Sequence, residues 1–439
     1  MRKIGFWTAL ALVIGNIIGA GIFTTTGYLA EKITNPGLFL TAWLAGGLYA
    51  VCGAFMYGLL AKKMPVNGGD YVYLKESFHP YFAYLFGWSG LFITYTGSIA
   101  ALAIGAAHYM NDLTLHYNMQ TVLWNLKIFQ FNLYIDGIRL AAFLLIVVFT
   151  YINYLGIRSG GRTQFLLTTA IVLLLAGFTA AGFYSGAQSP VIPVQSTSAG
   201  LTTFFSALPA ILFTYMGWTT IVYIAGEVKQ PGRTIPSALI IGVVIVTVLY
   251  FGLNYVFLST ASAAEFAGQV NVTSQAADKL WGSGASKFVA AMIIIAILSS
   301  LNSTILSGPR IYQTMAEDKF LWKNLAKMHD KYETPSTALW IQAGWSAALL
   351  FSGTFNELLT MVVAAILVFS ILTAFAAVKI MVRESYNIWY WTAAAAYILL
   401  CALVLLSILV ENPGESFWGF ALLLVSLPFY LLQKRSNAL

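Results

Sequence analysis

Long apolar stretches with very few charges are the feature that most constrains this chain. Of its 439 residues, 59% are hydrophobic and only 9% are charged, whereas a soluble domain carries about 25% charged residues. A chain so poor in charge cannot cover a folded core with a water-facing surface, so lipid must surround most of it. The 12 Trp and 24 Tyr residues are typical of rings that anchor helices at a membrane interface.

The apolar stretches divide into segments of about 20 residues, which is the length that crosses a bilayer as a helix. We therefore expect an all-α polytopic membrane protein with 12 transmembrane helices and no soluble domain. The first segment shows no small-residue cleavage site, so we expect a membrane helix there and not a signal peptide. The expected spans are approximately 6–30, 38–61, 80–110, 138–155, 164–184, 202–227, 237–258, 287–312, 337–352, 356–381, 388–410 and 416–432.

Lysine and arginine are unevenly distributed between the two sides of these spans. With both termini on one side, only Lys32, Lys127, Arg139, Lys279 and Lys287 of the 23 basic residues fall on the other side. Cytoplasmic loops are enriched in basic residues, so we expect both termini in the cytoplasm and the protein in the cell (inner) membrane. This topology also explains the net charge of +7 without a nucleic-acid partner.

The residues that carry most catalytic and cofactor chemistry are sparse. The two cysteines, Cys52 and Cys401, lie in apolar runs, and the four histidines are scattered, so neither a disulfide framework nor a metal cluster is expected. The chain has no phosphate-binding glycine loop with the spacing of an ATPase, and no cluster suggests a buried nucleophile with its base. We expect no enzyme activity and no organic cofactor.

Two of the expected spans carry helix-breaking residues near their middle. The first contains Gly15, Gly19 and Gly21, and each glycine weakens a helix by about 1 kcal/mol. The sixth contains the stretch 213–218, preceded by Pro209. Glycines also serve close helix packing, but interruptions five spans apart are typical of the binding site of a transporter with inverted repeats.

An interrupted helix has a defined binding chemistry. The amides at the start of its second half attract a carboxylate, and the carbonyls at the end of its first half attract an ammonium group. An α-amino acid carries both groups a few ångströms apart. Because the expected spans hold very few ionisable side chains near their centres, the substrate that this pattern favours is a neutral amino acid.

At these residues the sequence resembles the amino acid–polyamine–organocation (APC) superfamily of permeases. Four motifs of that superfamily occur in order and in register with the expected spans. They are 15–23 (GNIIGAGIF), 65–73 (PVNGGDYVY), 226–231 (GEVKQP, followed by Arg233, Ile235 and Pro236), and the pair 307–310 (SGPR) and 334–339 (TPSTAL).

The resemblance implies a LeuT-like 5+5 inverted repeat with broken helices 1 and 6, within a single membrane transporter domain 1–439. Repeat one would cover about 5–185 and repeat two about 200–382, with two accessory helices at about 388–432.

The resemblance also implies the residues of the substrate site. The amides of Ala20 and Gly21 would hold the substrate carboxylate, and the carbonyls of Ile17, Phe213 and Met216 would hold its ammonium group. Phe213 would also cover the substrate as an aromatic lid, and Gly217 belongs to the same stretch. We interpret Trp218 as a packing residue beside the break.

The resemblance also implies a possible sodium site that includes residues of the eighth span. Ala296, Ser299 and Ser300 share one helical face. In sodium-coupled proteins of this fold, a carbonyl and two hydroxyls at this spacing meet two carbonyls of the first break, here those of Gly15 and Ile18. Alternatively, the two serines bond back to their own helix.

The coupling mechanism is left open by the sequence. Several proton-linked and exchanging members carry a lysine on the fifth helix, and Ile171 occupies that position here. We expect a sodium- or proton-linked importer, with sodium favoured. The alternatives are an obligate exchanger of amino acids or amines and a sensor that binds without transporting.

Side chains on the third and eighth spans would select the substrate. The candidates are Trp88, Tyr95, Ser98, Asn302 and Ser303. The oligomeric state is open, and a monomer is consistent with the sequence.

Overall fold

Helices form nearly all of the chain, because in lipid each backbone N–H and C=O must find its partner within its own segment. The architecture is that of a computed structural model, which describes residues 2–113, 119–128, 131–185, 201–269, 271–351, 355–411, 414 and 425–433. Its elements are α1 (Phe6–Ile17), α2 (Gly21–Lys32), α3 (Pro36–Lys63), α4 (Asp70–Ser77), α5 (Pro80–Ser89), the π-helical turn η1 (Gly90–Thr94), α6 (Tyr95–Leu113), β1 (Val122–Ile128), β2 (Phe131–Asp136), α7 (Gly137–Tyr154), α8 (Ile157–Tyr184), α9 (Leu201–Thr214), α10 (Thr220–Tyr223), η2 (Ala225–Glu227), α11 (Pro231–Thr260), α12 (Ala263–Phe266), α13 (Val272–Trp281), α14 (Ala285–Glu317), η3 (Lys323–Ala326), α15 (Ser336–Phe351), α16 (Phe355–Arg383) and α17 (Ile388–Glu411).

Within the described residues, nine helical segments are long and apolar enough to cross a membrane. They are Phe6–Lys32, Pro36–Lys63, Pro80–Leu113, Gly137–Tyr154, Ile157–Tyr184, Pro231–Thr260, Ala285–Glu317, Ala364–Arg383 and Ile388–Val410. Large apolar side chains such as Leu173, Val248 and Val410 are exposed on the outside of the bundle, as lipid contact requires. The chain is therefore a polytopic membrane protein.

The other three expected spans differ from these nine. The sixth is divided between α9 and α10, and the ninth is α15, a helix of only 16 residues. The twelfth, 416–432, lies largely outside the described residues, of which 425–433 are helical.

One β-hairpin departs from the all-α expectation. Strands β1 and β2 pair antiparallel, with Ile128 opposite Phe131, in the connection between the third and fourth spans. The Asp136 carboxylate ends the hairpin and caps α7, because it accepts from the Arg139 amide at 2.7 Å and pairs with the Arg139 guanidinium at 2.8 Å. A connection outside the membrane can pair its backbone N–H and C=O groups between two strands. A search for apolar spans does not detect such strands.

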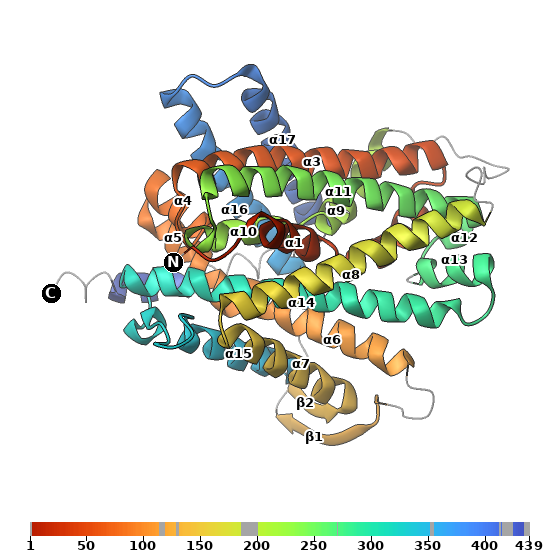
Figure 1. The fold of residues 1–439 in the computed structure, drawn as a ribbon, viewed down its shortest axis with the longest axis horizontal. Helices are drawn as coiled ribbons and strands as arrows, with labels where there is room; N and C mark the ends of the chain where they lie inside the picture. Colours follow the sequence, from red (N-terminus) through yellow and green to blue (C-terminus); the bar gives the residue numbers. More distant parts are fainter. Residues whose placement is uncertain are drawn as a thin grey trace.

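Helix α1 lies in the middle of the bundle, and Figure 1 shows it between α11, α8 and α14. All its residues from Ala9 to Gly15 are buried. Helices α3 and α11 run side by side along one flank, while α6, α7 and α15 form the other. The interruption at the end of α1 therefore falls inside the protein and away from lipid.

Both expected interruptions are present. Helix α1 ends at Ile17, Ile18 is extended, and α2 starts at Gly21. Helix α9 ends at Thr214, five turn residues follow, and α10 starts at Thr220. Within that turn Gly217 has φ +105°, and a Cβ there would lie 2.5 Å from the Asn16 carbonyl oxygen. The two breaks therefore touch, and glycine is required at the contact.

A buried ion pair ties the segment after α10 to α14. The Arg310 side chain is only 1% exposed and donates to the Glu227 carboxylate at 2.9 Å and to the Leu306 carbonyl at 2.6 Å. The backbone carbonyl of Glu227 in turn accepts from the amides of Lys3 and Ile4. The N-terminus, the sixth span and α14 thus meet at this pair.

We expect Glu227→Ala to lower the free energy of unfolding by about 3 kcal/mol, because removing one partner leaves a buried charge unpaired. Thermal unfolding of the purified protein in detergent measures this. Lys279→Ala is the matched control, since the pair of Lys279 with Glu265 is largely exposed and such pairs contribute little. Equal melting temperatures for the two variants would contradict the prediction.

Candidate functional site

A cavity of about 460 Å³ lies between the two interruptions. All six residues expected in the substrate site line it. They are Ile17, Ala20, Gly21, Phe213, Met216 and Gly217. The volume falls in the range of small-molecule sites. The walls come from α1 to α6 with η1, from α9, α10 and the turn between them, and from α14, α16 and α17.

The first break exposes backbone donors to this cavity. Among the described residues, no backbone carbonyl accepts from the amide of Ala20 or Gly21. The carbonyl of Ile17 accepts the Tyr250 hydroxyl at 3.1 Å, which leaves its second lone pair. The Phe213 carbonyl accepts the Met216 amide at 3.0 Å. The start of α2 is thus a positive helix end that faces the cavity, the arrangement that binds anions.

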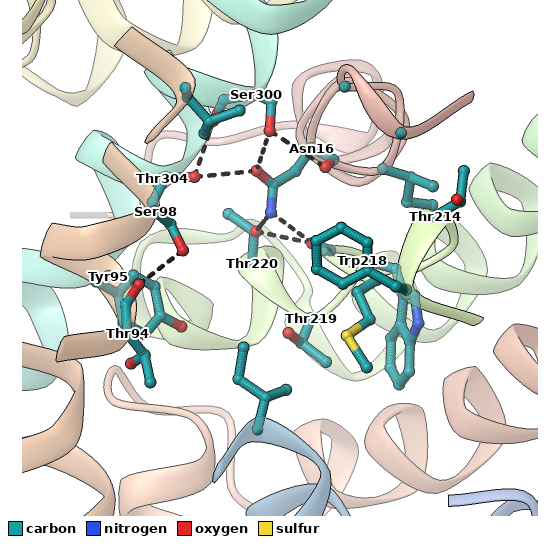
Figure 2. Close-up of a pocket in the computed structure, with 18 of the residues that line it drawn as sticks. Asn16, Thr94, Tyr95, Ser98, Thr214, Trp218, Thr219, Thr220, Ser300 and Thr304 are labelled. Atoms are coloured by element: carbon teal, nitrogen blue, oxygen red, sulfur yellow. Dashed lines mark hydrogen bonds between the residues drawn. The ribbon is translucent and has the colours of Figure 1, made fainter. Parts of the chain in front are cut away.

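Asn16 joins the two breaks to each other and to α14. Its side-chain nitrogen donates to the Gly217 carbonyl at 2.7 Å and to the Thr220 hydroxyl. Its side-chain oxygen accepts from the hydroxyls of Thr304 at 3.2 Å and Ser300 at 3.4 Å. Figure 2 shows this residue at the centre of the lining side chains. One amide thus fixes the spacing of three helical segments around the cavity.

Hydroxyl groups dominate the polar part of the wall. Thr25 and Thr214 bond to each other at 2.8 Å across the two interrupted spans, and Ser98 lies opposite them on α6. Among the described lining residues, Asp70 is the only one with an acidic or basic side chain of the Asp, Glu, Lys, Arg or His type. The Phe213 ring is 39% exposed, so it borders the open space and is not packed in the core.

The two serines of the expected sodium site have different partners. Ser299 is fully buried, and its hydroxyl accepts from the Gln164 side-chain amide at 2.9 Å and contacts the Thr168 hydroxyl at 3.1 Å. Ser300 lies on the cavity wall and donates to the Asn16 backbone carbonyl at 3.4 Å. Both hydroxyls bond to other helices, not back to α14.

The other residues of the expected sodium site surround this contact. A Cβ at Gly15 would collide with the side chains of Gln164, Thr168 and Ser299, so the glycine lets α1 approach them. Ile18 and Ala296 are fully buried next to it. Ile171 is also fully buried, in the position where some members of the superfamily carry a lysine.

The selectivity candidates divide into two groups. Tyr95 and Ser98 line the cavity. Trp88 instead packs on Phe92 and Phe429. Two further candidates bond to neighbouring helices, Asn302 to Gln164 and Asn153, and Ser303 to the Leu12 carbonyl.

Trp218 borders the cavity while packing at 5.0 Å on Tyr57 and at 6.3 Å on Tyr397. It is both a lining residue and a packing residue. Tyr397 belongs to α17, outside the repeats expected from the sequence, and also lines the cavity.

Sequence reasoning missed several residues at this site. Asn16 stands inside the first-helix motif, and an amide within a glycine-rich break is a signal that could have singled it out. Gln164 and Thr168 are four residues apart and therefore share a helical face. Nothing in the local pattern around Tyr397 indicates that α17 reaches the cavity.

The apolar segments, the two touching breaks and the cavity between them are features of permeases, the class of membrane proteins that bind a solute within the bilayer. The comparison with known proteins agrees. The chain belongs to the amino acid permease family, whose sequence profile matches residues 4–428.

Curated relatives of this chain are transporters. It is 30% identical to the serine/threonine exchanger SteT of Bacillus subtilis (strain 168), over 85% of this chain and 82% of that protein. It is 26% identical to amino acid transporter protein 6 of Caenorhabditis elegans, over 82% and 68%. It is 27% identical to the branched-chain amino acid permease BcaP of Bacillus subtilis (strain 168), over 79% and 74%.

We expect Asn16→Asp to weaken binding of the substrate roughly 30-fold or more, because it removes both donors to the second break and leaves the half-buried Gly217 carbonyl without one of its partners. The measurement is the dissociation constant, in each variant, of an amino acid that raises the melting temperature of the unmodified protein. Asn271→Asp, at an exposed position before α13, is the matched control. Equal affinities for the two variants would contradict the role of Asn16.

Proposed function

We propose that this protein transports small neutral amino acids across the cell membrane by alternating access. The observation that carries the proposal is the juxtaposition of the unpartnered Ala20 and Gly21 amides with the turn at 215–219, across one cavity. The amides suit a carboxylate, and the carbonyls of Ile17, Phe213 and Met216 suit an ammonium group. No charged side chain is needed for either.

The wall favours a small substrate with hydrogen-bonding capacity. Ser98, Thr214 and Thr219 line the cavity, and the Phe213 ring supplies an apolar cover. The relative that is named for serine and threonine supports the same size class, whereas the one named for branched-chain substrates supports a larger apolar group. We favour serine, threonine and alanine.

The proposal includes the architecture that the resemblance implies. It comprises 12 helices in a LeuT-like 5+5 inverted repeat, with repeat one at about 5–185, repeat two at about 200–382 and the accessory helices at about 388–432. Both termini would lie in the cytoplasm, which follows from the distribution of lysine and arginine.

Two coupling mechanisms are candidates. The first is sodium symport through Gly15, Ile18, Ala296, Ser299 and Ser300. The second is obligate exchange, and one observation favours it. The Gln164 amide group directs its donors at the Ser299 hydroxyl, so a group with partial positive charge already lies against one of the proposed sodium ligands.

A thermal-shift screen of the 20 amino acids tests the substrate class, since a ligand stabilises the state that it binds. Serine, threonine and alanine should raise the melting temperature, and lysine and glutamate should not. No described lining residue is basic, and the one lining carboxylate, that of Asp70, already accepts three hydroxyl groups. Stabilisation by lysine or glutamate alone, or by none of the 20, would overturn the proposal.

Uptake into proteoliposomes distinguishes the coupling mechanisms and excludes a sensor. An exchanger requires internal substrate and takes up the same amount with sodium or choline outside. A sodium symporter works with empty vesicles, and Ser300→Ala should raise the sodium concentration for half-maximal uptake several-fold. Binding without uptake under either condition would indicate a sensor.

A further inference from the structure

One buried carboxylate forms part of the cavity wall without a role in the site described above. Asp70 is only 2% exposed and lines the cavity as the first residue of α4. Within the described part of the chain, no lysine or arginine forms an ion pair with it. A buried carboxylate without a cation must obtain its stabilisation from hydrogen bonds.

Three hydroxyl groups from three other segments supply these bonds. Tyr57 on α3 and Thr373 on α16 donate to one carboxylate oxygen, and Tyr223 on α10 donates to the other, each at 2.6 Å. Distances this short are typical of charge-assisted O–H···O⁻ bonds. We call Asp70, Tyr57, Tyr223 and Thr373 the Asp70 cluster. Burial raises the pKa of the Asp70 carboxyl, and the three hydroxyl bonds oppose that shift.

The cluster attaches the second half of the interrupted sixth span to the loop before α4. The Gly68 amide donates to the Tyr223 carbonyl at 3.0 Å, and the Gly226 amide donates to the Asn67 side chain at 2.9 Å. A Cβ at Gly69 would collide with the Tyr223 ring. The loop 67–70 is therefore shaped to fit α10, next to the point where Asp70 and Tyr223 line the cavity.

The position of this contact matters for access. Residues 3–4 pair with 227–229 just beyond it, and Figure 1 shows α4 beside the N-terminus. The hydroxyls of Tyr57 and Thr373 reach Asp70 from helices that are not interrupted, whereas Tyr223 comes from the short helix directly after the break. A movement of α10 would remove Tyr223 and leave the other two bonds in place.

We propose that the Asp70 cluster is the closure of the cavity towards the N-terminal face, and that it opens when the Tyr223 hydroxyl leaves the Asp70 carboxylate. This inference rests on the proposed function, because closure has a role only if access alternates. Asp70 is then a positioning residue, which holds α10 closed and makes no contact with the substrate.

Thiol accessibility tests the proposal. A reporter is placed in the cavity with Ser98→Cys, after Cys52 and Cys401 are replaced by alanine. A membrane-impermeant thiol reagent is then applied to the N-terminal face in oriented vesicles. Asp70→Asn replaces one of the two acceptor oxygens by an NH₂ donor, so the three donating hydroxyls can no longer all be accepted. Labelling from this face should therefore accelerate roughly tenfold or more, and labelling from the opposite face should slow down.

Tyr223→Phe is the milder variant, because it removes one hydroxyl and keeps the ring packed on Phe86. It should shift labelling in the same direction, by a smaller factor. Asp136→Asn is the matched control. It removes a buried carboxylate that caps α7 and does not line the cavity. Its Ser98→Cys reporter should be labelled at the same rate as in the protein with an intact Asp70 cluster.

The outcomes separate the two proposals. If serine or threonine stabilises the parent but Asp70→Asn and Tyr223→Phe both label like Asp136→Asn, the closure role of the Asp70 cluster is wrong and the proposed function stands. If no amino acid stabilises the parent, the proposed function fails, whatever the labelling shows. Faster labelling from the N-terminal face in Tyr223→Phe supports the closure even if Asp70→Asn does not fold.

Discussion

Every backbone polar group inside a bilayer must have a partner, and this requirement determines both the fold and the site. The long helices satisfy it internally, so they need only apolar surfaces towards lipid. The first and sixth spans depart from it near their middle. Their freed groups are surrounded by protein, and part of the need is met by side chains, chiefly the Asn16 amide, which bonds to the Gly217 carbonyl. What is left unpaired, at Ala20 and Gly21, is available to a solute. The proposed binding site thus consists of backbone groups for which the protein itself supplies no partner.

The parts of this arrangement that depend on local sequence could be predicted. Hydropathy locates the long helices, glycine locates the breaks, and the resemblance assigns six of the residues that line the cavity. Partners that lie far apart in the chain could not be predicted in this way. Asp70 is 153 residues from Tyr223, and no periodicity links them. The hairpin of β1 and β2 was missed for a related reason, since short strands outside the membrane leave no apolar span.

The polar contacts between the central helices fall into two connected groups. One joins α1 to the turn before α10 through Asn16. The other joins α8 to α14 through Gln164, Thr168 and Ser299, and it reaches the Ala11 carbonyl of α1. Each hydrogen bond is modest in net energy, but in an apolar interior the alternative is an unsatisfied group. The two groups therefore hold α1, α8, α14 and the turn before α10 in one defined arrangement.

Tyr397 belongs to α17, the last long helix along the described chain, and lines the central cavity. Its ring stacks on Tyr49 of α3 at 5.0 Å and reaches the cavity beside Trp218. A chimera that joined residues before α17 from one permease to α17 from another would therefore build the cavity wall from two different proteins. An exchange of cavity residues between two members of the family should therefore transfer α3 and α17 together, because their tyrosine rings stack on each other.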